Sequence, residues 1–372
     1  MTIGASPPLN QTPPEIREVV APTPRVPRIR EPLWDNARLL AAVLICAGHF
    51  TDPFVAPDNS WAALWVALWP FRVPVFVVLS GYFTSTQPHT LRSVWALVRD
   101  IALVYVIFQT IAILQQGWYR DIWDWSYDEP GLALWFLLSL FVWRLAAPYL
   151  WRIPGRLIVA FAVAILGGFL DLSTQWAWAR TVAWLPLFVV GLELRNPRFV
   201  AWLRVRTQQI VASVLLTVSL AAGMLLGGQV RRSPLMMRSG YSGAFESQII
   251  DAGVRSVALV VAAVLALALL SVIPRGRIVW WTALGAGSFT VYLLHPVVLR
   301  YLASLDVFSD LVTTPRCLAW AAGAVLLGLV LATPPVRRAT AWLTRPRTFA
   351  VFMTGVTSAS RLRGRRNRRP LP

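Results

Sequence analysis

Apolar residues run along most of this chain in uninterrupted stretches, each about as long as a helix must be to cross a lipid bilayer. Polar residues gather in the connections between these stretches and at the two ends of the chain. The pattern predicts an all-α fold, a polytopic membrane helix bundle with about ten transmembrane helices. The expected spans cover residues 33–51, 62–83, 93–114, 131–150, 156–172, 178–194, 208–228, 253–273, 279–303 and 317–333.

The two ends of the chain differ from the apolar part between them. Residues 1–32 contain eight prolines and no apolar run that could form the core of a signal peptide, so we expect a disordered cytoplasmic tail. Residues 33–333 form the expected transmembrane domain, and residues 334–372 form a basic cytoplasmic tail. No polar stretch between the tails is long enough for a second, soluble domain.

Composition excludes several classes of protein. With 56% hydrophobic and 14% charged residues, the chain is unlike an ordinary soluble domain. The net charge of +18 would suggest a nucleic-acid partner in a soluble protein, but ten arginines lie between Arg337 and Arg369 in the expected tail. We therefore expect a lipid bilayer and no nucleic acid as partner. The two cysteines, Cys46 and Cys317, lie in apolar segments, so no metal site is expected.

Loop charges predict an orientation, because cytoplasmic loops of membrane proteins are enriched in arginine and lysine. With the N-terminus inside, most loop arginines fall on the inner side, and acidic residues such as Asp52 fall in the outer connections. We expect a multi-pass protein of a bacterial inner or plasma membrane with both termini in the cytoplasm. The connection 229–252 departs from the rule, because Arg231, Arg232 and Arg238 fall outside. A glycan-facing role and a plain solvated loop both explain it.

The first span has a polar face. Arg38 and His49 are eleven residues apart, which is about three helical turns, and Asp35 lies one turn before Arg38. Ionisable residues within a membrane are costly and usually face a protein interior or a water-filled cavity. Arginine suits phosphate or carboxylate, and neutral histidine suits removal of a hydroxyl proton or transient binding of an acyl group. The pattern favours donor binding by Arg38 and catalysis by His49. A snorkelling Arg38 and a structural hydrogen bond from His49 are the alternatives.

Further motifs follow the Arg38 and His49 pair in a fixed order: PFRVPVFVVLSGYF at 70–83, LWFLLSLF at 134–141, LPLFVVGLEL at 185–194 and GAGSFTVYLLHPVV at 285–298. The set resembles the acyltransferase-3 superfamily of integral membrane O-acyltransferases, and it is most similar to the fucose 4-O-acetylase-like branch. The resemblance covers residues 33–333. It departs from the fucose-type pattern at Arg72, where that pattern usually has a histidine.

The resemblance implies an O-acyltransferase, usually one that transfers acetyl from cytosolic acetyl-CoA to a hydroxyl group of a glycan or other extracytoplasmic acceptor. It implies that His49 and Arg38 form the catalytic pair, with acetyl-CoA as the donor substrate and no bound cofactor. The further candidates for binding donor or substrate are Asp35, Arg72, Ser80, Tyr82, Trp135, Glu193, Ser288, Tyr292 and His295.

Several of these candidates have a structural alternative. Asp35 either orients Arg38 or caps the first helix, and Glu193 either contacts the donor or pairs with a loop arginine. His295 is either a second active-site group or the source of a hydrogen bond that defines the fold.

Two rival functions use the same residues differently. In a membrane transporter or flippase of a glycan or glycolipid, the polar residues would form a proton-coupled path. In a polysaccharide-assembly partner without catalysis, the polar face of the first span would be incidental. Whatever the function, close helix packing is the structural alternative for the Ser80-Gly81-Tyr82 motif and for Trp135.

Overall fold

The computed structural model describes residues 31–55, 60–170, 172–242, 247–308 and 314–346. From Pro32 onward these residues form one unit of helices, and no strand occurs among them. The expected all-α fold is confirmed. Nearly all of the expected N-terminal tail lies outside the described residues, as do residues 347–372 with their cluster of arginines.

The helices follow one another along the chain with short connections. In order they are α1 (Pro32–Thr51), α2 (Ser60–Leu68), α3 (Val73–Tyr82), α4 (Leu91–Leu97), α5 (Leu103–Arg120), α6 (Trp135–Leu150), α7 (Arg156–Leu166), α8 (Trp178–Ala183), α9 (Leu185–Glu193), α10 (Pro197–Leu203), α11 (Arg206–Leu226), α12 (Arg232–Met236), α13 (Gln248–Val272), α14 (Val279–Leu284), α15 (Ser288–Ser304), α16 (Thr314–Leu331), α17 (Pro334–Ala339) and α18 (Ala341–Thr344).

Each of the ten expected spans contains helix, but they differ in length and continuity. In the described part of the chain, five helical stretches are long and apolar enough to cross a membrane: Ser60–Tyr82, Leu91–Arg120, Arg206–Gln229, Gln248–Val272 and Val279–Ser304. Three apolar helices are shorter: Trp135–Leu150, Arg156–Phe169 and Pro315–Leu331. The molecule is therefore a membrane helix bundle, and a total of ten crossings stays a prediction.

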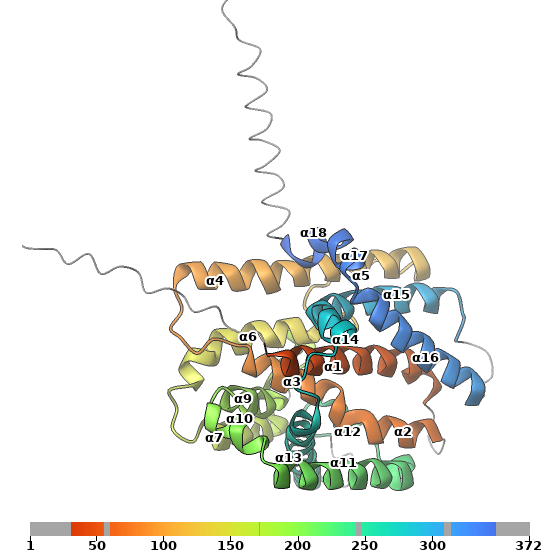
Figure 1. Ribbon diagram of the computed structural model, residues 1–372. Coiled ribbons are helices and arrows are strands. Elements are labelled where there is room, and N and C mark those ends of the chain that lie inside the picture. The colour runs from red at the N-terminus through yellow and green to blue at the C-terminus, as the bar shows by residue number, and fades with distance from the viewer. Residues whose placement is uncertain (1–30, 56–59, 171, 243–246, 309–313, 347–372) are drawn as a thin grey trace, which may run out of the picture. The chain divides into compact units, whose positions relative to one another are not determined.

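Helix α1 lies among the other helices and packs against α3, α14, α15 and α16 (Figure 1). Most of its side chains toward these neighbours are small or apolar, and Leu39, Ala42 and Cys46 are fully buried. The buried Asn36 accepts a hydrogen bond from the hydroxyl of Thr282 in α14 at 2.7 Å. The remaining face holds Arg38 and His49, which are partly exposed. Packing on several sides thus fixes the direction in which the polar face of α1 points.

Two proline residues divide the expected span 62–83. Proline lacks a backbone N–H and clashes with the preceding helical turn, so it interrupts a regular helix. Pro70 lies in the 3₁₀ turn Trp69–Phe71, and Pro74 opens α3. Arg72 lies between them with φ −95° and ψ −100°, outside the helical region, and its side chain is buried. The break directs Arg72 toward α1, where Gly48 leaves room for its guanidinium.

A π-helical turn, Val98–Ala102, joins α4 to α5 within one continuous helix. Such turns are rare and often occur at functional sites, because they displace the side chains of one turn. Here Asp100 and Ile101 of the turn border the largest cavity described below.

Helices α3 and α9 approach closely at Gly81 and Gly191. A Cβ on Gly191 would overlap the carbonyl oxygen of Val78 and lie 2.9 Å from the Cα of Gly81. Small residues are typical where two membrane helices come this near. The packing interpretation of the Ser80-Gly81-Tyr82 motif is therefore confirmed for Gly81.

We expect Gly191→Ala to destabilise the protein by about 1–3 kcal/mol, because the added methyl group meets backbone that cannot move independently. The matched control is Gly253→Ala in α13, where a Cβ would meet nothing within 4 Å. The measurement is the midpoint of thermal unfolding in detergent, followed by tryptophan fluorescence. Equal midpoints for the two variants would contradict the close approach of α3 and α9.

Candidate functional site

The two ends of α1 open onto different cavities. Arg38 lies near the start of the helix and borders one cavity, while His49 lies near its end and borders two others. The helical rise separates the two residues by roughly 17 Å along the axis. The predicted polar face of α1 therefore connects two separate binding spaces.

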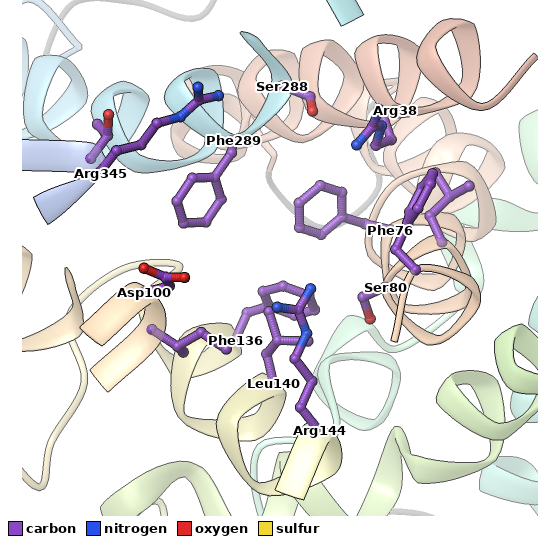
Figure 2. Close-up of a pocket in the computed structure, with 14 residues that line it drawn as sticks. Arg38, Phe76, Ser80, Asp100, Phe136, Leu140, Arg144, Ser288, Phe289 and Arg345 are labelled. Carbon is purple, nitrogen blue, oxygen red and sulfur yellow. The ribbon is translucent and has the colours of Figure 1, made fainter. Parts of the chain in front are cut away.

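The larger space, here the Arg38 cavity, has a volume of about 530 Å³. Figure 2 shows that Arg38, Arg144 and Arg345 reach it from different parts of the chain and that Asp100 lies on the side away from Arg38. Its remaining lining is Phe76, Leu79, Ser80, Phe83, Ile101, Phe136, Leu140, Ser288, Phe289 and Thr344. Three guanidinium groups on a mostly apolar wall suit a ligand with both phosphate groups and an apolar part.

Arg38 is held in place on both sides. The carboxylate of Asp35, which is buried, forms an ion pair with its guanidinium. The ring of Phe83 lies under the guanidinium at 4.4 Å. The structure thus shows Asp35 in contact with Arg38, one of the two roles left open for it by the sequence.

His49 has a carboxylate neighbour on the next turn. Its Nδ1 lies 3.4 Å from Oδ2 of Asp52, in the short turn Asp52–Phe54 (η1) that follows α1. Asp52 also accepts a hydrogen bond from Nε1 of Trp65 at 2.6 Å, and a nitrogen of Arg72 lies 3.9 Å away. A proton on Nδ1 facing Asp52 leaves Nε2 with a free lone pair. This is the arrangement that a histidine needs to act as a general base.

The environment of Asp52 favours its charged form. Burial acts to raise the pKa of this carboxyl group, but the contacts with His49, Arg72 and Trp65 outweigh burial and lower the pKa below the usual value of an aspartate. Asp52 is therefore an ionised partner for His49 at neutral pH.

His295 of α15 lies directly against His49. The two imidazole rings stack with centroids 5.3 Å apart and an interplanar angle of 19°. Nδ1 of His295 lies 2.9 Å from the carbonyl oxygen of Val291, and its Nε2 has no hydrogen-bond partner among the described residues. The fully buried His295 thus lies beside the candidate catalytic residue, and its hydrogen bond stays within α15 and does not join two helices.

The space around His49 consists of two adjoining cavities of about 90 Å³ and about 350 Å³. We call them together the His49 chamber, because both are lined by His49, Trp135, Arg180 and Arg238. The smaller part adds Asp52, Arg72 and the indoles of Trp65, Trp69 and Trp184. Aromatic walls with a few convergent polar groups are typical of small-molecule sites.

Aromatic rings lie between the two spaces. Phe76 and Phe136 border the Arg38 cavity, and both pack against Tyr292, with ring centroids 5.5 Å and 5.6 Å apart. The ring of Tyr292 is in turn 6.5 Å from that of His295. These ring contacts therefore run from the wall of the Arg38 cavity to His295, which stacks on His49.

A comparison of the whole sequence with known families decides the class of protein. The family model described as an acyltransferase domain (Acyl_transf_3) matches residues 32–334. The chain belongs to the acyltransferase-3 family. No curated protein and no solved structure matches the chain. As a member of this family it is a membrane acyltransferase, whose reaction needs an acyl donor and a hydroxyl acceptor.

Most candidate residues of this acyltransferase surround the two spaces. Ser80 and Ser288 line the Arg38 cavity, and Arg72 and Trp135 line the His49 chamber. Tyr292 belongs to the aromatic layer and donates a hydrogen bond to the carbonyl of Ala133 at 2.7 Å.

Asp35, Tyr292 and His295 contact the lining of these spaces without lining them, whereas Tyr82 and Glu193 are engaged elsewhere. The ring of Tyr82 stacks on that of Trp34 at 3.8 Å. Glu193 pairs with Arg156 at 2.6 Å, so the structure realises the salt bridge that was the alternative for this residue. Among the described residues, no group of three or more His, Cys, Asp or Glu side chains could hold a metal ion.

The candidates from the sequence do not include the lining residues Asp52, Asp100, Arg144, Arg180 and Arg345, and Arg238 entered only through the glycan-facing option for its loop. Asp52 is three residues after His49 and so lies near it on one helical face, a spacing that could have identified it. Arg144 and Arg180 lie within expected spans, where an ionisable residue is itself a signal of function.

Proposed function

We propose that this acyltransferase is an O-acetyltransferase of the bacterial cell membrane, in the fucose 4-O-acetylase-like branch of its family and with both termini in the cytoplasm. It transfers acetyl from cytosolic acetyl-CoA to a hydroxyl group of a sugar or similar extracytoplasmic acceptor. The placement of Arg38 and His49 on one helix, each facing a separate cavity, is the main support for this proposal.

The Arg38 cavity suits the donor. Acetyl-CoA has several phosphate groups at one end and a thioester at the other, and arginine binds phosphate with charge-assisted hydrogen bonds. Arg38, Arg144 and Arg345 supply three such groups. The apolar wall toward Phe76 and Phe136 matches the uncharged arm that leads to the thioester.

The His49 chamber suits the acceptor. Nε2 of His49 takes the proton of the acceptor hydroxyl while the hydroxyl oxygen attacks the thioester carbon. The carbon–sulfur bond then breaks, the ester forms, and the proton passes to the departing thiolate, which yields free coenzyme A. Asp52 stabilises the imidazolium that exists between these two proton transfers.

Comparison of strains tests the proposed function. Glycans and small molecules from a deletion strain and from a complemented strain are compared by mass spectrometry. We expect a product heavier by one acetyl group only where the chain is present, with acetyl-CoA consumed. An unchanged acylation profile would contradict the proposal, as would movement of a substrate across the membrane without use of acetyl-CoA.

We expect Arg345→Ala to raise the KM for acetyl-CoA about fivefold with little change in kcat, because an exposed cation contributes modestly and equally to substrate and transition state. Arg345 follows α18 and lies beyond the part of the chain that the family model matches. The control is Arg338→Ala, an exposed arginine of α17 that does not line the cavity. An unchanged KM would remove Arg345 from the donor site.

A further inference from the structure

The His49 chamber contains two arginines that form no ion pair with its acidic residues. Arg180 and Arg238 line both parts of the chamber. The structure shows no ion pair between a described carboxylate and either of these two arginines. Of the acidic residues in the chamber, Asp52 faces His49 and Arg72, and Glu129 is exposed at the wall of the larger part. Arg180 and Arg238 therefore have no acidic partner among the described residues.

The two arginines are close enough to repel each other. Both line the same two parts of the chamber, so their like charges face one space. The ring of Trp135 lies 4.8 Å from the guanidinium carbon of Arg180 and keeps it in the chamber. Two neighbouring guanidinium groups without a carboxylate partner are a common arrangement for binding an oxyanion, because a shared anion removes the repulsion and satisfies both.

The segment that contains Arg238 is hydrogen-bonded to the rest of the bundle both before and after this residue. Before it, Arg232 donates a hydrogen bond to the carbonyl of Val55 at 3.0 Å. After it, the carbonyl of Ser239 accepts a hydrogen bond from Arg255 at 2.9 Å, and the hydroxyl of Tyr241 donates one to the backbone of the bundle. The three arginines that departed from the charge rule thus belong to a segment that closes over the chamber.

The backbone around the chamber is strained. Ala133, Ala177 and Met237 adopt left-handed conformations with φ of 64°, 58° and 50°. Residues with a side chain pay a steric cost in this region, and such strain often occurs at ligand sites. Ala133 and Ala177 line the chamber, and the buried Met237 directly precedes Arg238. The residues near these strained positions, Trp135, Arg180 and Arg238, all line the His49 chamber.

We infer that the acceptor carries an oxyanion, a carboxylate or a phosphate, and that Arg180 and Arg238 bind this group while His49 receives the hydroxyl. The inference rests on the proposed function, and it defines the substrate class of that site. An acidic sugar fits the chamber in each respect: the indole rings suit the sugar ring, and the two arginines suit the acid. The oxyanion fixes the position of the hydroxyl relative to Nε2 of His49.

Arginine footprinting tests the binding of an oxyanion without any acyl transfer. The full chain in lipid nanodiscs reacts with phenylglyoxal in the presence of glucose, glucuronate or glucose 6-phosphate at equal ionic strength. Mass spectrometry then gives the rate of modification at each arginine. We expect one of the acidic sugars to slow the reaction of Arg238 about threefold or more, as occupancy of a site predicts, and glucose to have no effect. The two acidic probes distinguish carboxylate from phosphate.

Arg231 is the internal control, because it is exposed, belongs to the same segment and does not line the chamber. Equal protection of Arg231 and Arg238 would overturn the inference, since it would reflect general ion binding. Equal protection by glucose, or no protection by either acidic sugar, would also overturn it.

The native product gives a second test. The product that cells form with the wild-type chain, but not with His49→Ala, is applied to an anion exchanger at neutral pH. We expect it to be retained, and we expect the double variant Arg180→Gln, Arg238→Gln to raise the KM for the acceptor with less effect on that for acetyl-CoA. A neutral product would overturn the inference and leave the acyltransferase function standing. If no such product exists, the proposed function fails and footprinting alone decides whether the site binds an oxyanion.

Discussion

Replacement of His49 by alanine is expected to lower kcat for acyl transfer by about 100-fold to 10,000-fold, the usual contribution of a general base. The variant loses the imidazole of α1 that lines the His49 chamber, which is the proposed acceptor of the hydroxyl proton. It keeps Arg38 and its cavity, so the KM for acetyl-CoA should change little. The measurement is the formation of acetylated product by purified protein in lipid nanodiscs.

His89→Ala is the matched control for this variant. His89 bonds to Ser93 and to the backbone of Leu145, and it lines neither the Arg38 cavity nor the His49 chamber. Its replacement should leave kcat unchanged. Full activity of His49→Ala, with correct membrane insertion, would exclude His49 as the catalytic base.

Replacement of Asp52 by asparagine is expected to lower kcat by about 100-fold or more, as seen where an aspartate orients a catalytic histidine. The amide of asparagine has no negative charge to stabilise the imidazolium. Its NH₂ group can also donate to Nδ1 of His49, which would place the ring proton on Nε2 and remove the base. The KM for acetyl-CoA should again change little, because Asp52 does not line the Arg38 cavity.

The control for Asp52 is Asp124→Asn, since Asp124 is exposed and lines neither space. Partial recovery of kcat in Asp52→Glu would show that the charge, and not the shape of the side chain, is needed. If Asp52→Asn instead lowers thermal stability and leaves kcat intact, Asp52 supports Trp65 and Arg72 only.

The hydrophobic pattern predicted the helical fold well, because each span must satisfy its backbone hydrogen bonds within itself. It did not predict where helices break. The expected span 62–83 is divided around Arg72, and the expected span 178–194 is divided at Trp184, just before Pro186. The apolar composition continues through both breaks, so hydropathy alone contains no signal of them, although the prolines do.

The candidate site was predictable where its residues share one helix. Asp35, Arg38 and His49 lie on α1, and helical geometry places them without reference to the rest of the fold. Arg180 and Arg238 come from distant segments and meet His49 only through tertiary packing. No local spacing could have brought them together, and Arg345 lay in a segment expected to be a tail.

The π turn at Val98–Ala102 bears on the evolution of this protein. A π turn is what remains when one residue is inserted into an existing α-helix. Loss of one residue there would restore regular hydrogen bonding but rotate all of α5 by about 100°. Gln109, which holds the backbone of Ser126, Glu129 and Gly131, would then face elsewhere. Relatives without the extra residue should therefore align with a gap at this turn.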